Sequence, residues 1–65
     1  MDEYQELIQK TREAFANRKV INAALLQRKF RIEYPKAAHV IIDMQIAGML
    51  SNKYDRQAGG YRVLW

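Results

Sequence analysis

The stretch "LLQRKFRIEYPKAAHVI", residues 25–41, places four basic side chains and one proline within an otherwise apolar, helix-forming run. Inside a continuous helix, Pro35 would cost about 3 kcal/mol. At the start of a new helix it costs little, because the N–H that proline lacks has no partner in the first turn. The stretch therefore predicts two helices joined by the tight turn "RIEY", residues 31–34.

The two predicted helices are residues 23–30 and residues 35–47. Asn22 is a suitable N-cap for the first helix, and Gly48 is a natural residue to end the second. A short turn between two helices is typical of a helix-turn-helix. Helical spacing predicts a core side for the pair, made by Leu26, Phe30, Ala37, Val40, Ile41, Met44 and Ala47.

The flanking segments complete the predicted fold. A first helix begins at Asp2, its N-cap, and ends near Asn17; its core positions are Tyr4, Leu7, Ile8, Thr11 and Phe15. Val20-Ile21 is β-branched and suits a brief strand. Residues 49–50 and 61–65 flank a loop with the turn signal Gly59-Gly60, which predicts a β-hairpin with Lys53, Tyr54 and Arg56 at its tip. Residues 1–65 are thus expected to form a single domain of mainly α, α+β class: a winged helix-turn-helix, three helices followed by a hairpin wing.

Composition narrows the classes of function. The formal charge is +4, with nine basic against three acidic residues after residue 17, and a basic surface on a small domain favours nucleic acid as the partner. The absence of cysteine and the single histidine argue against a metal site. No apolar run approaches the roughly 20 residues of a membrane span. We therefore expect a cytoplasmic protein that takes no cofactor and no small-molecule substrate.

The sequence also offers no catalytic group. It has no paired-carboxylate arrangement, no Ser/His/Asp constellation and no phosphate-cradling glycine loop. His39 stands without a nucleophile or partner base in the sequence pattern, so we expect it to contact DNA and not to catalyse a reaction. The chain is predicted not to be an enzyme.

Residues 25–50, "LLQRKFRIEYPKAAHVIIDMQIAGML", resemble the gamma domain of the FtsK/SpoIIIE DNA translocases. That family's pattern is approximately L-L-Q-R-[RK]-F-R-I-G-Y-N-R-A-A-R-[LI]-I-x-x-[ML]-E-x-x-G-[IV]-V, with a short wing and a last strand like R-E-V-L-V. The matching residues are Leu25, Leu26, Gln27, Arg28, Lys29, Phe30, Arg31, Ile32, Tyr34, Ala37, Ala38, Ile41, Met44 and Gly48, with Val63-Leu64 at the end. No Walker A motif is present, so the translocase motor is absent from these residues.

The resemblance implies a nucleoid-associated winged helix that reads guanine-rich duplex DNA and touches a Xer-type recombinase. The chain departs from the family pattern on the reading surface, where Glu33, Pro35, Lys36 and His39 replace Gly, Asn, Arg and Arg. Lysine lacks the planar fork with which arginine grips guanine in two places. We therefore expect a different or weaker sequence preference than the family has.

The candidate DNA-binding residues fall into three groups. Lys36 and His39 lie near the start of the second helix of the pair, where such motifs read bases. Tyr34 either packs beneath the turn or bonds to a phosphate. The expected phosphate contacts come from the helix-end cluster Arg28, Lys29 and Arg31 and from the hairpin residues Lys53, Arg56 and Arg62.

A second hypothesis rests on Ile42 and Ile46. They lie one helical turn apart on the side opposite the predicted core, together with Pro35 and His39. Either the first helix or the hairpin covers them, or they form a surface for a recombinase, a translocase or a second copy of the chain. The chain would then be a protein-interaction module, or an inhibitor that competes with a host DNA-binding protein. A small stand-alone protein of a phage or mobile element suits either hypothesis, as does a domain excised from a translocase.

Overall fold

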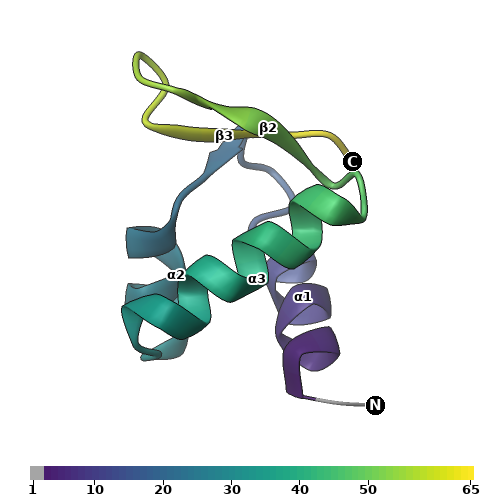
Figure 1. The fold of residues 1–65 in the computed structure, drawn as a ribbon, viewed down its shortest axis with the longest axis vertical. Coiled ribbons are helices and arrows are strands. Elements are labelled where there is room, and N and C mark those ends of the chain that lie inside the picture. Colours follow the sequence, from purple (N-terminus) through teal and green to yellow (C-terminus); the bar gives the residue numbers. More distant parts are fainter. Residues whose placement is uncertain (1–2) are drawn as a thin grey trace.

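The computed structural model describes residues 3–65, and the predicted N-cap Asp2 lies outside this range. Within these residues lie three helices and a three-stranded antiparallel sheet, which confirms the mainly helical α+β class (Figure 1). The elements are α1 (Glu3–Ala14), β1 (Val20–Ile21), α2 (Ala23–Phe30), α3 (Tyr34–Ile46), β2 (Leu50–Asp55) and β3 (Gly60–Val63). This order is compatible with a winged helix. The first helix ends at Ala14, before the predicted Asn17, because residues 15–17 form a turn.

Helix α2 has the predicted bounds, and Asn22 is its N-cap. The side-chain oxygen of Asn22 accepts a hydrogen bond from the backbone N–H of Leu25 at 2.8 Å. Its amide nitrogen donates to the carbonyl oxygen of Gly59 at 2.7 Å. One side chain therefore both starts α2 and ties it to the turn of the hairpin, 37 residues further along the chain.

Replacement of Asn22 by aspartate should separate these two roles. Aspartate keeps the capping oxygen but has no donor for the Gly59 carbonyl, so we expect a loss of about 1–2 kcal/mol of stability. Asn22→Ser, which caps without charge, should lose a similar amount, and Asn22→Ala should lose more. Urea unfolding followed by circular dichroism measures the series. Equal stability of the aspartate variant and the native chain would show that the bond to Gly59 contributes nothing.

Helix α3 begins and ends as its sequence signals require. It runs one residue ahead of the predicted range 35–47, with Glu33 as N-cap and Pro35 in the first turn. At its end, Gly48 adopts a φ of 78°, its N–H donates to Gln45, and the N–H of Met49 donates to Met44 at 2.8 Å. These two bonds form a Schellman motif. The chain therefore leaves α3 in a fixed direction toward the sheet.

The core fills the space between the helices and the sheet. Thr11 is fully buried, and its hydroxyl donates to the Leu7 carbonyl at 2.7 Å. Ala47 was predicted to lie in the core but is exposed, because α3 ends at Ile46 and Ala47 is the cap residue. The buried apolar residues are Phe15, Ile21, Leu26, Ala37, Val40, Ile41, Met44 and Leu50. Helices α2 and α3 are thus fixed against a common centre.

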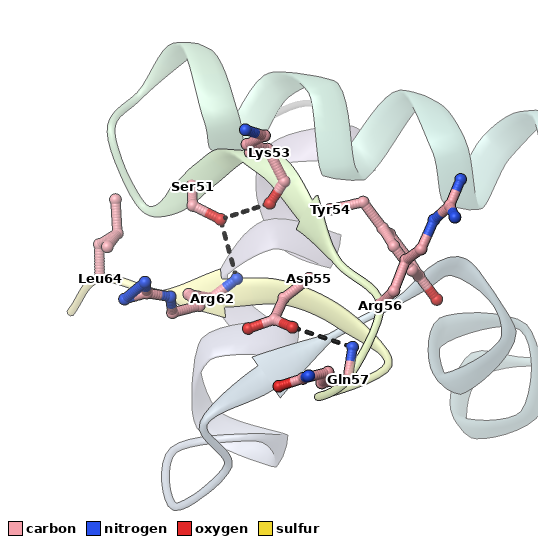
Figure 2. A pocket seen from close by; sticks show the side chains of 8 residues that line it. All are labelled: Ser51, Lys53, Tyr54, Asp55, Arg56, Gln57, Arg62 and Leu64. Atoms are coloured by element: carbon pink, nitrogen blue, oxygen red, sulfur yellow. Dashed lines mark hydrogen bonds between the residues drawn. The ribbon is translucent and has the colours of Figure 1, made fainter.

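The sheet has the strand order β1-β3-β2, so the last strand is central. Val20 and Ile21 pair with Arg62 and Tyr61, which confirms the predicted brief strand. A bulge interrupts the β2–β3 pair, where residues 51–53 lie opposite Arg62 alone. The hydroxyl of Ser51 fills the gap: it accepts from the Arg62 N–H at 2.9 Å and donates to the Lys53 carbonyl at 3.1 Å (Figure 2).

Two predictions about the hairpin were wrong. Lys53 and Tyr54 lie within β2 and not at the tip, because β2 continues to Asp55. Gly60 lies in β3 and is buried, because its missing side chain lets the backbone of β1 approach; only Gly59, with a φ of 80°, serves the turn. The tip is closed instead by Asp55, whose carboxylate accepts from the N–H groups of Gln57 and Ala58.

Candidate nucleic-acid interface

The end of α2 and the turn after it carry one cluster of positive charge. Arg28 and Lys29 lie in the last turn of α2, Arg31 follows as its C-cap, and all three side chains are exposed. Within residues 3–65, no ion pair joins them to an acidic group. We call these three residues the turn cluster. Sequence reasoning predicted it, and the structure brings its members together at one end of the helix pair.

Arg31 holds an unusual backbone conformation. Its φ of 55° and ψ of 46° lie in the left-handed region, where it is the only residue other than glycine among those described. This conformation costs an L-residue roughly 1–2 kcal/mol, and glycine or asparagine normally takes the position. The conformation ends α2, as left-handed residues commonly do at helix C-termini, and it holds an exposed cation in the turn before α3.

The hairpin carries a second set of exposed cations, Lys53 in β2, Arg56 in the turn and Arg62 in β3. They line a shallow hollow of about 490 Å³ together with Ser51, Tyr54, Asp55, Gln57 and Leu64. Figure 2 shows Arg56 and Arg62 leaving the hairpin in opposite directions. The Asp55 carboxylate, which accepts two backbone N–H groups, makes no ion pair with them within the described chain. We call these three residues the hairpin cations.

The two predicted base-reading residues both have partners within the fold. Lys36 forms an ion pair with Glu3 of α1. The Nε2 atom of His39 lies 3.3 Å from a carboxylate oxygen of Asp43, and its ring stacks on Tyr4 with 4.3 Å between centroids. Both side chains therefore belong to the α1 side of α3, and contact with a base requires them to leave these partners.

The outward side of α3 is apolar. The side chains of Tyr34, Ile42 and Ile46 are 61%, 53% and 80% exposed. Neither α1 nor the hairpin, as far as the structure describes them, covers the two isoleucines, so the alternative in which one of them buries this pair is wrong. Tyr34 likewise does not pack beneath the turn; it faces solvent, where a phosphate or another partner can reach it.

A groove of about 550 Å³ borders this apolar side, between the start of α2, α3 and the hairpin. Its walls include Tyr54 and Tyr61, whose rings meet edge to face at 5.3 Å. The remaining lining residues are Asn22, Ala23, Ala24, Tyr34, Ala38, Ile41, Ile42 and Gln45. Sequence reasoning missed this groove, because only the pairing of β2 with β3 places the two tyrosines opposite α3.

Two other kinds of site that the described residues could form are a metal centre and a membrane span. Among residues 3–65, no three acidic, histidine or cysteine side chains gather as metal ligands would. Within the same range, none of the helices has both the length and the apolar character needed to cross a membrane.

Comparison with known proteins adds no relative. No family model, no curated protein and no solved structure matches this chain. The likeness of residues 25–50 to the translocase gamma domain therefore stays a prediction from the sequence.

Proposed function

We propose that this chain binds double-stranded DNA as a winged helix-turn-helix module, with α3 directed to the major groove and the hairpin as the wing. The observation that carries the proposal is the exposure of the turn cluster and the hairpin cations without acidic partners within residues 3–65. Such cations release the counterions that DNA holds, and this release supplies most of the affinity of non-specific binding.

The positions of the two sets of cations suit a duplex. The molecule is 32 Å long, with the hairpin at its upper end, the α2–α3 turn toward its lower end, and α3 between them (Figure 1). The major groove is about 12 Å wide and is bordered by phosphates on both sides. With α3 in the groove, we expect the turn cluster to contact one backbone and the hairpin cations the other.

Binding of this kind positions the protein more than it selects a sequence. Phosphate contacts carry no base information, and Lys36 and His39 are occupied by Glu3, Asp43 and Tyr4. We therefore infer that guanine-rich duplexes are not favoured as the gamma-domain resemblance implied. A cytoplasmic, nucleoid-associated protein follows from the same proposal.

Titration of random and guanine-rich duplexes at low and moderate salt tests the proposal. Four to five phosphate contacts predict an affinity that falls about 150-fold to 500-fold between 50 and 200 mM salt. The guanine-rich duplex should bind no more tightly than the random one. Fluorescence anisotropy with labelled duplexes gives both results. An absence of binding at 50 mM salt would reject the proposal.

Arg31→Gly should raise stability while lowering DNA affinity. Glycine relieves the left-handed strain, so we expect a gain of about 0.5–1 kcal/mol, net of the greater freedom of glycine in the unfolded chain. Loss of one phosphate contact should weaken binding about fivefold to tenfold near 0.1 M salt. Thermal melting and anisotropy measure the two effects. Arg31→Lys, which keeps both charge and strain, is the control; unchanged affinity of the glycine variant would remove Arg31 from the interface.

A second candidate function is protein interaction through the two isoleucines. Their exposure, 53% for Ile42 and 80% for Ile46, is the specific observation that favours it, because exposed apolar side chains one turn apart often mark a contact surface. The partner would be a recombinase, a translocase or a second copy of the chain. Sedimentation velocity across a range of concentrations tests self-association directly, and a concentration-independent monomer would exclude the second copy.

A further inference from the structure

The outward side of α3 offers a ligand apolar contact and little else. Along this side lie Pro35, Ala38, Ile42 and Ile46, and the neighbouring polar groups of Lys36 and His39 already have partners. This side of α3 carries no arginine that could donate a pair of hydrogen bonds to the edge of a base. Apart from the Tyr34 hydroxyl and the Gln45 amide, base contact by the outward side of α3 therefore has to be made by carbon atoms.

The surroundings of this apolar side are cationic. Arg28 lies one turn beyond Ala24, whose side chain lines the groove beside α3, and Arg56 extends from the hairpin. The outward side of α3 is thus an apolar strip with positive charge on either side. It fits a ligand that has an apolar centre and negatively charged edges. The major groove of thymine-rich DNA has this form, because thymine methyl groups line its floor and phosphates border it.

We propose that α3 contacts the 5-methyl groups of thymine through Ile42 and Ile46, and that this chain prefers thymine-rich duplexes. The inference rests on the proposed DNA-binding function and names its substrate. Residues four apart lie about 6 Å apart along a helix axis. Base pairs are about 3.4 Å apart, so the two isoleucines reach methyl groups roughly two base pairs apart.

The size of the effect follows from the burial of methyl groups. Each buried methyl group is expected to strengthen binding about fourfold. The free energy gained when one CH₂-sized group leaves water corresponds to a change of about fourfold in the dissociation constant. Two contacts predict a preference of about tenfold or more. Guanine and cytosine carry no methyl group, so guanine-rich duplexes gain nothing from this side of α3.

Uracil gives a direct test, because a uracil-containing duplex lacks the methyl groups but keeps the same charge and the same hydrogen-bonding edges. Two A·T-rich duplexes of one sequence are compared, one with thymine and one with uracil throughout. Anisotropy titrations at two salt concentrations are run with the native chain and with Ile42→Ala. Trp65→Ala is the control, since Trp65 is also an exposed apolar side chain but lies against Arg12 of α1, outside α3 and outside the turn cluster and the hairpin cations.

The native chain and Trp65→Ala should bind the thymine duplex about tenfold more tightly than the uracil duplex, and Ile42→Ala should lose most of that preference. All three should show the same dependence on salt. Equal, salt-dependent affinity for the two duplexes would overturn the methyl contact, keep DNA binding and leave the isoleucines to a protein partner. A lack of binding to either duplex would overturn the DNA-binding proposal itself, and with it the methyl contact.

Discussion

Gly60→Ala is expected to remove about 2–3 kcal/mol of stability, the cost of forcing extra atoms into a packed site. A Cβ atom on Gly60 would lie 2.7 Å from the carbonyl oxygen and 3.0 Å from the carbonyl carbon of Ile21. Both atoms are backbone, and β1 is held against β3 by pairing at Ile21 and Tyr61. Relief therefore requires β1 to move away, although the Ile21 side chain is fully buried in the core.

The effect should be large in proportion, because a domain of this size seldom has more than about 3–5 kcal/mol of stability. Urea unfolding followed by circular dichroism measures it. Gly59→Ala is the control: its added Cβ meets no atom within 4 Å, but its φ of 80° is unfavourable for alanine. That variant should lose only the left-handed strain of about 1–2 kcal/mol. A smaller loss for Gly60→Ala than for Gly59→Ala would contradict the close approach of β1.

The features that the sequence predicted well are local ones. Asn22 caps α2, Pro35 lies in the first turn of α3, and Gly48 ends α3 in a left-handed conformation. Each depends on side-chain and backbone chemistry within about four residues, so a single sequence contains the whole cause. The spacing of apolar residues likewise predicted the buried face of α3, apart from its last position at Ala47.

The features that the sequence did not predict depend on contacts between distant residues. Gly60 was read as part of a turn, because its role becomes visible only when β1 pairs with β3. The bulge at Ser51 lengthened β2 and moved Lys53 from the tip into the strand. The hydrogen bonds of the Ser51 hydroxyl and the close approach of Ile21 to Gly60 produce no recognisable pattern in the sequence.

The candidate site shows the same difference between local features, which the sequence predicts, and contacts between distant residues, which it does not. The turn cluster was predictable, because Arg28, Lys29 and Arg31 are close in sequence and end one short helix. The contacts that Lys36 and His39 make with α1 were not, because Glu3 and Tyr4 lie more than thirty residues away in the sequence. The packing of α1 against α3 thus engages Lys36 and His39, the two residues expected to read bases. The outward side of α3 that remains is apolar and lies between two cationic regions, the turn cluster and the hairpin cations.

Reversal of charge in the turn cluster is the sharpest test of what those cationic regions do. Arg28→Glu combined with Lys29→Glu removes two phosphate contacts, each of which contributes about eightfold in affinity near 0.1 M salt. The new carboxylates also repel the backbone, so we expect affinity for any duplex to fall at least about 100-fold. The dependence of log affinity on log salt should become shallower by about 2, since each lost contact removes about 0.9.

The control has to change the net charge equally without touching the proposed interface. Lys10→Glu combined with Lys19→Glu does so, because both side chains are exposed and lie in α1 and just before β1, outside the two cationic regions. If the whole-molecule charge governs binding, both double variants lose affinity alike. If the turn cluster contacts phosphates, only the Arg28/Lys29 variant loses the steep salt dependence, while the control keeps the native slope and loses affinity only a few-fold. Thermal melting of both variants checks that each is folded, and equal behaviour of the two in the titration would place the DNA contact elsewhere on the molecule.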